Sequence, residues 1–136
     1  MSLRVGRLLV ATPIAELLAV AGLLIPALVG FATMKATVTA RMFEMQTIAS
    51  WSAPSAGFLF CLLGGWWVAR GAGMAHERNG LALGIAVGAA DLVLLVASGA
   101  PFGLLTVSSV SSRIVGGYSG GTIARHRASR LAGARV

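Results

Sequence analysis

Charge is scarce in this chain of 136 residues: only 11% of the residues are charged, and aspartate and glutamate together number 4. A soluble domain averages roughly a quarter charged residues, so the composition excludes a globular protein with an ordinary polar surface. Hydrophobic residues instead make up 57% of the chain, and the mean hydropathy is +0.85. The composition therefore predicts a membrane protein.

Residues that carry chemistry are also few. The single cysteine, Cys61, excludes an intramolecular disulfide, and we interpret it as a small packing residue. The two histidines, His76 and His126, fall in polar segments, and we expect His76-Glu77-Arg78 to be a solvated turn. The sequence contains no Walker loop, no paired-cysteine motif, no His-Glu-x-x-His and no Gly-x-Ser-x-Gly. We therefore expect no enzyme activity, no cofactor and no metal.

Four apolar segments are long enough to cross about 30 Å of hydrocarbon as helices of about 20 residues. They are residues 8–30, 51–69, 80–99 and 102–122. In lipid every backbone polar group must be paired internally, and the segments lack the alternation of a membrane barrel. The first segment is longer than the apolar core of a signal peptide and contains Glu16, so we expect it to be retained. The sequence predicts one all-α domain, 1–136, with four transmembrane helices in two hairpins.

Basic residues orient these helices. Lys35 and Arg41 fall in the segment 31–50, whereas eight of the eleven basic residues flank the opposite ends of the spans. The eight are Arg4, Arg7, Arg70, Arg78, Arg125, Arg127, Arg130 and Arg135. Positive loops stay cytoplasmic, so both termini are expected on the cytoplasmic side of a bacterial inner membrane, and residues 31–50 on the external side. Trp66 and Trp67 would anchor the inner interface and Trp51 the outer one.

The basic tail, 123–136, contributes to a net charge of +7. Nucleic-acid binding is one alternative, but no aromatic residue interleaves the arginines. We favour anchoring by the positive-inside rule, with attraction to anionic lipid heads as the second interpretation. In the external segment, Met34, Met42 and Met45 raise the alternative of soft-metal binding. An interfacial amphipathic stretch explains them better, because no histidine or cysteine accompanies them.

The two halves of the sequence resemble each other. Glu16 corresponds to Asp91 and Pro26 to Pro101 at an offset of 75, and Arg70 corresponds to Arg125 at an offset of 55. Because short matches also arise by chance in apolar sequence, we keep two alternatives open: a parallel internal repeat of two hairpins, or coincidence.

Small residues recur on the predicted helices at spacings of four. Such stripes let helix backbones approach closely in a membrane, as in a glycine zipper. The predicted packing glycines are Gly57, Gly65, Gly80, Gly84, Gly88, Gly117 and Gly121. Ordinary bundle packing is the favoured interpretation, and contact with a second subunit is the alternative.

One stretch resembles a known kind of protein. Gly64-Gly65-Trp66-Trp67-Val68-Ala69-Arg70, followed by a polar loop and Gly80-x-x-x-Gly84-x-x-x-Gly88, is similar to small bacterial four-helix inner-membrane proteins of uncharacterised families. The resemblance covers about residues 60–125. It implies a fold and a location and carries no activity.

Three ionisable residues lie within the predicted spans: Glu16, Asp91 and Arg113. Asp91 precedes Pro101 by ten residues and Arg113 follows it by twelve, so a turn there sets both at one depth. One guanidinium with five donors can serve both acids. We therefore expect an intramembrane charge cluster in which one acid tends to stay protonated.

Three functions fit the sequence. The favoured one is a structural or accessory membrane protein, a homo-oligomer or a subunit of a larger complex. The alternative is a small proton-coupled transporter or channel that uses Glu16, Asp91 and Arg113. An enzyme with an intramembrane site is the remaining hypothesis.

Overall fold

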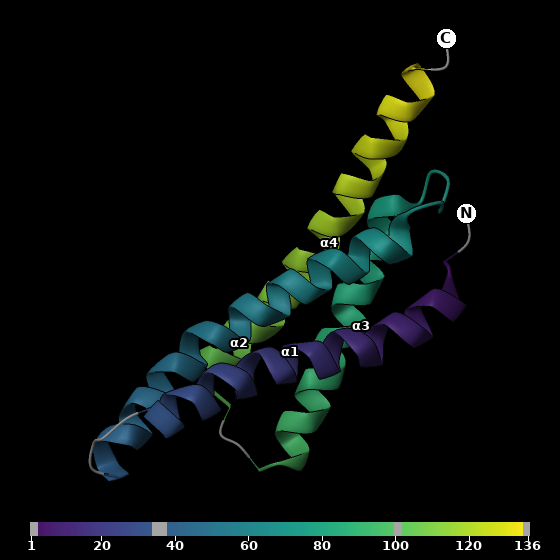
Figure 1. Cartoon of the computed structure of the whole chain (residues 1–136). Coiled ribbons are helices and arrows are strands. Elements are labelled where there is room, and N and C mark those ends of the chain that lie inside the picture. The colour runs from purple at the N-terminus through teal and green to yellow at the C-terminus, as the bar shows by residue number, and fades with distance from the viewer. Residues whose placement is uncertain (1–2, 34–37, 100–101, 135–136) are drawn as a thin grey trace.

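In the computed structural model, residues 3–33, 38–99 and 102–134 are described (Figure 1). They form four helices, α1 (Val5–Thr33), α2 (Val38–Ala69), α3 (His76–Ala97) and α4 (Leu104–Gly133). The structure is 89% helix, with no strand in the described ranges. The predicted all-α fold is confirmed. Four residues singled out above, Met34, Lys35, Pro101 and Arg135, lie outside the described ranges.

Three helices in the described part of the chain are long and apolar enough to cross a membrane. They are Val5–Thr33, Met42–Ala69 and His76–Ala97. The predicted fourth span, in α4, is not confirmed, because serines, glycines and Arg113 lower its apolar character. The three helices nevertheless support the assignment of the chain to the membrane proteins.

Two helices extend well beyond the predicted spans. α2 begins at Val38, so much of the segment 31–50, which was predicted to be external to the membrane, is continuous with this helix. α4 continues to Gly133, so the basic tail is helical as well. The α2 extension contains alanine, methionine, glutamate and arginine, and the α4 extension contains alanine and arginine, all of which favour helix whatever their hydropathy. Hydropathy sets where a chain can enter lipid, and it does not set where a helix ends.

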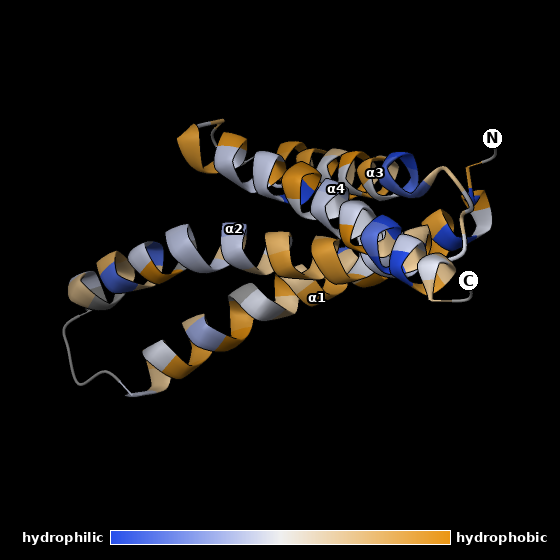
Figure 2. Ribbon diagram, turned by 90° about the horizontal axis from the view of Figure 1, so that it is seen from above, coloured by the Kyte–Doolittle hydropathy of each residue, from blue (hydrophilic) through white to orange (hydrophobic). Residues whose placement is uncertain are grey.

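The helices form two antiparallel hairpins, α1–α2 and α3–α4. The chain termini lie at the same end of the molecule, and the hairpins diverge away from that end (Figures 1 and 2). α4 packs on α2 and α3, and α1 also packs on α2 and α3. Within the described residues α1 does not pack on α4. In an exact repeat α1 would correspond to α3 and α2 to α4, so the contact between α2 and α3 would have an equivalent between α4 and α1. Because that equivalent contact is absent from the described residues, the two hairpins are not packed symmetrically.

Glycines allow α4 to lie between α2 and α3 at close range. A Cβ on Gly117 would lie 2.8 Å from the backbone nitrogen of Gly84 on α3, and one on Gly121 would lie 2.8 Å from the His76 carbonyl oxygen. On the neighbouring face, a Cβ on Gly120 would lie 2.6 Å from the Trp66 backbone nitrogen. Real Cβ atoms do not come so close to backbone. The spacing of α4 from both neighbours therefore depends on glycine.

The partner helices contribute matching glycines. A Cβ on Gly65 would lie 2.5 Å from the Gly117 carbonyl oxygen, and one on Gly84 would lie 2.7 Å from the Arg113 carbonyl oxygen. Gly80 packs against the same stretch of α4, whereas a Cβ on Gly88 would lie 3.2 Å from the Val110 side chain and 3.8 Å from the Val110 carbonyl oxygen. Close packing is thus concentrated between Gly65, Gly80, Gly84 and α4.

Basic and aromatic side chains meet at the end that holds the termini. Arg7 donates a hydrogen bond to the Arg70 carbonyl oxygen at 2.9 Å, and its guanidinium lies 5.5 Å from the centre of a Trp67 ring. Arg125 forms an ion pair with Glu77 at 2.9 Å. The N-terminus, the α2–α3 connection and the second half of α4 therefore form one basic end. Trp51 lies on α2 and is 76% exposed.

Candidate functional site

The three ionisable residues singled out from the sequence meet in the interior of the bundle. Arg113 on α4 donates from Nε to Glu16 Oε2 on α1 at 3.4 Å and from Nη2 to Glu16 Oε1 at 3.4 Å. The same Nη2 donates to Asp91 Oδ1 on α3 at 3.1 Å, and Nη1 lies 3.1 Å from Asp91 Oδ2. One guanidinium thus holds both carboxylates, and it joins three helices.

Ser109 completes the cluster. It lies one turn before Arg113 on α4, and its hydroxyl accepts a hydrogen bond from Arg113 Nη1 and donates one to Asp91 Oδ2 at 3.2 Å. The Ser109 carbonyl oxygen accepts a further bond from Arg113 Nη1 at 3.3 Å. Serine fits this position because its hydroxyl can accept and donate at once. Its position four residues before Arg113 places Ser109 on the same helix face, from which its hydroxyl reaches the guanidinium.

Gly57 on α2 makes room for the guanidinium. A Cβ built on Gly57 would lie 3.0 Å from Arg113 Nη1 and 3.3 Å from its Cζ. Any larger residue would therefore press on the charged group itself. Gly57 was predicted as a residue that packs helix against helix, and the structure gives it a more local role. Arg113 reaches α1 between α2 and α3 because this position lacks a side chain.

Burial differs among the three charged side chains. The Arg113 side chain is 4% exposed and that of Glu16 is 9% exposed, whereas that of Asp91 is 25% exposed. Ionisation of both acids would leave the cluster with a surplus negative charge. Because a charge out of water is costly, the Glu16 arm depends more on its arginine partner than the Asp91 arm does.

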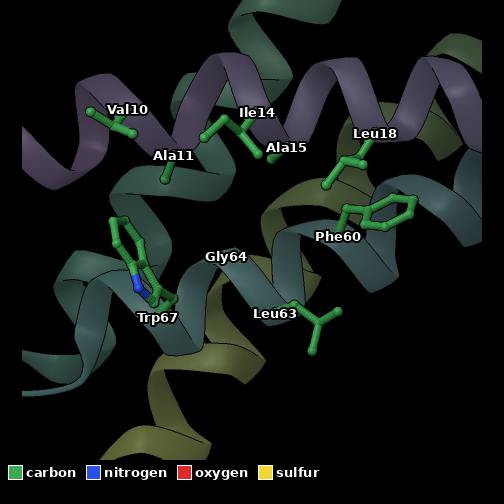
Figure 3. Close-up of a pocket in the computed structure, with 9 residues that line it drawn as sticks. All are labelled: Val10, Ala11, Ile14, Ala15, Leu18, Phe60, Leu63, Gly64 and Trp67. Atoms are coloured by element: carbon green, nitrogen blue, oxygen red, sulfur yellow. The ribbon is translucent and has the colours of Figure 1, made fainter.

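A lateral groove of about 540 Å³ reaches Glu16 between α1 and α3. Apart from Glu16 and Thr12 its lining is apolar: Pro13, Leu17, Val20, Ala90, Val93 and Leu94. A second groove, of about 380 Å³, lies between α1 and α2 (Figure 3). Its lining is Val10, Ala11, Ile14, Ala15, Leu18, Phe60, Leu63, Gly64 and Trp67. Of these two grooves, only the first has an ionisable residue in its lining, Glu16.

Two buried polar residues near the basic end were missed or misjudged. Asn79, which is fully buried, accepts a hydrogen bond from the Arg4 backbone at 2.9 Å and donates one to the Ala75 carbonyl oxygen at 2.8 Å. His76 was expected in a solvated turn, and that expectation is wrong: His76 begins α3 and is 7% exposed. The approach of α4 through Gly121 covers it. The charged residues that follow His76 in the sequence gave no indication that α4 packs against it.

The methionines and the cysteine singled out from the sequence are not among the residues bonded to Arg113. Met42 and Met45 lie on α2, and Cys61 is a free, buried thiol on the same helix. Within the described residues no group of three or more His, Cys, Asp or Glu side chains is placed to hold a metal ion.

Comparison with known proteins gives no match: no family model, no curated protein and no solved structure matches the chain. The resemblance to small four-helix inner-membrane proteins therefore stays a prediction.

Proposed function

We propose that this chain is an integral membrane protein of structural or accessory type, in which the cluster of Glu16, Asp91 and Arg113 locks the helices together. It spans a bacterial inner membrane four times with both termini in the cytoplasm. It works as a homo-oligomer or as a subunit of a larger membrane complex. It is not an enzyme and needs no cofactor.

The hydrogen bonds that Arg113 makes to its neighbours support this proposal. Its guanidinium donates to Glu16 on α1, to Asp91 on α3 and to Ser109 on its own helix. α1 and α4 do not pack on each other in the described residues, so this side chain is the link between them. A buried polar network whose members are all satisfied fixes one arrangement of the helices. That is the behaviour expected of a structural clamp.

The position of the charged groups supports the four-span topology. The basic end unites the N-terminus, the α2–α3 connection and the second half of α4, as the positive-inside rule requires of cytoplasmic segments. α4 would cross the membrane with its polar and glycine positions turned toward α2 and α3. Its buried residues include Thr106, Arg113, Gly117 and Gly121. Its exposed residues are mainly apolar, as at Leu104, Val107 and Val115, although Ser108 and Ser111 are exposed too.

Assembly with other subunits is supported by the amount of apolar surface. Leu9 and Leu17 on α1, Phe43 on α2 and Val93 on α3 are each more than 65% exposed. Lipid can cover such a surface, and so can the helices of a partner.

A small proton-coupled transporter is the second candidate, and one observation favours it. Glu16 lines the groove between α1 and α3, so an acid of the cluster can be reached from the side of the bundle. Ionisable groups on such a path are the usual carriers of protons through membranes. In this alternative the bonds to Arg113 would break and reform as Glu16 takes up and releases its proton.

Glu16→Gln separates the two functions, because glutamine keeps an acceptor for Arg113 but cannot exchange a proton. We expect the variant to fold and assemble, and proteoliposomes of either protein with a pH-sensitive dye inside to show no proton flux. Glu44→Gln, at an exposed position on α2, is the matched control. A flux that the wild type and the control support and Glu16→Gln lacks would overturn the structural proposal.

A further inference from the structure

The basic end contains a pocket of about 310 Å³ that the charge cluster does not use. Its lining combines the end of α2, the start of α3 and the second half of α4. The lining residues are Trp66, Arg70, Gly71, His76, Ala124, Arg127, Ala128 and Leu131. The volume lies at the lower end of the range of small-molecule sites, about 300–1,000 Å³.

Two guanidinium groups flank this pocket on one aromatic ring. Arg70 lies 5.2 Å and Arg127 lies 6.0 Å from the centre of a Trp66 ring. Neither forms an ion pair with an acid among the described residues. The nearest acid in the sequence, Glu77, is already paired with Arg125 at 2.9 Å. Trp66 therefore orients two positive charges whose carboxylate partners are missing, which favours an anionic ligand.

The start of α3 adds to this preference. His76 opens the helix and lines the pocket at 7% exposure, and no hydrogen bond joins its ring to another described residue. The residue before it, Ala75, makes no side-chain capping bond, so the positive end of the helix dipole lies beside the pocket. Because the His76 side chain lines the pocket and its ring bonds to no described residue, the ring nitrogen atoms are available to a polar group of a ligand.

The rest of the lining is apolar, and it lies at the end of the bundle that the arginines assign to the membrane surface. Ala124, Ala128 and Leu131 would suit the glycerol region of a lipid, whereas the arginines would suit its phosphate. We propose that this pocket binds the phosphate headgroup of an anionic phospholipid from the cytoplasmic leaflet. The inference rests on the membrane location argued under Proposed function.

Binding can be measured on the detergent-solubilised protein by native mass spectrometry with short-chain phosphatidylglycerol. We expect preference over short-chain phosphatidylcholine. Arg70→Gln with Arg127→Gln should reduce binding by about a hundredfold, because each of the two lost charge-assisted bonds is worth roughly a factor of ten. Ala128→Phe should reduce it similarly, since it fills the pocket at an exposed helix position and leaves every charge in place.

Arg130→Gln is the matched control, because Arg130 is exposed on the same helix and does not line the pocket. Equal losses in Arg130→Gln and the double variant, or unchanged binding in Ala128→Phe, would overturn the proposal in favour of diffuse charge attraction. Displacement of the lipid by equimolar inorganic phosphate would overturn the lipid assignment. Resistance of the protein to alkaline extraction from membranes tests the membrane location separately, so the two failures can be told apart.

Discussion

The geometry of the charge cluster predicts how much stability is lost when Arg113 is replaced. Arg113→Gln removes the partner of two carboxylates at once, and Glu16, whose side chain is 9% exposed, is the more deeply buried of the two. Breaking a buried pair from one side costs about 3–5 kcal/mol in free energy of unfolding. Glu16→Gln or Asp91→Asn leaves the guanidinium with one carboxylate, so each should cost less, about 1–3 kcal/mol.

The order of the combined variants is the sharper test. Asp91→Asn together with Arg113→Gln still strands Glu16, so this double change should recover only part of the loss. The triple variant Glu16→Gln, Asp91→Asn and Arg113→Gln replaces every charge of the cluster with a neutral amide. We expect it to be more stable than Arg113→Gln alone, although it carries two more substitutions, because no unpaired charge remains.

Unfolding can be followed by tryptophan fluorescence as the mole fraction of sodium dodecyl sulfate is raised in mixed micelles. Trp66 and Trp67 lie on α2, which packs on each of the other helices, so their emission should change as the bundle opens. Arg130→Gln, exposed on α4, is the control and should change stability by less than about 0.5 kcal/mol. A triple variant less stable than each of the single variants Glu16→Gln, Asp91→Asn and Arg113→Gln would contradict this prediction. The three losses of stability would then add as if the residues did not interact.

Two further predictions concern the space beside Gly57 and the membrane topology. Gly57→Ala should destabilise the protein, because its Cβ would lie 3.0 Å from the buried guanidinium, whereas Gly6→Ala, with nothing within 4 Å, should be neutral or stabilising in the same micelle assay. In a Cys61→Ala background, a membrane-impermeant thiol reagent applied outside should label Met42→Cys and spare Met74→Cys. Both side chains are well exposed, at 68% and 94%, so a reversed pattern would contradict the orientation rather than reflect burial.

Much of this architecture could be predicted because it follows from the chain itself. Hydropathy over twenty residues marks helices that can enter lipid, and counting from a predicted turn set Asp91 level with Arg113. The structure brings these two together with Glu16. Rise per residue and the shortage of charge were sufficient for that inference.

The parts that escaped prediction depend on contacts between helices. Gly57 belongs to a stripe of small residues, but its position against a guanidinium requires the rotation of α2 relative to α4. His76 lies in a polar sequence and becomes buried because α4 approaches α3 at Gly121. The shape of the pocket beside Trp66 likewise depends on three segments that are distant in sequence.

The bond between Glu16 and Arg113 joins residues 97 positions apart, on the first and the last helix of the chain. During synthesis the carboxyl group of α1 must therefore enter the membrane long before its guanidinium partner exists. Throughout that interval the hairpin α1–α2 is an incomplete product with an unsatisfied acid. The missing cation, Arg113, is supplied only by α4. In the proposed topology, a protein truncated before α4 would leave Glu16 inside the membrane without its guanidinium partner.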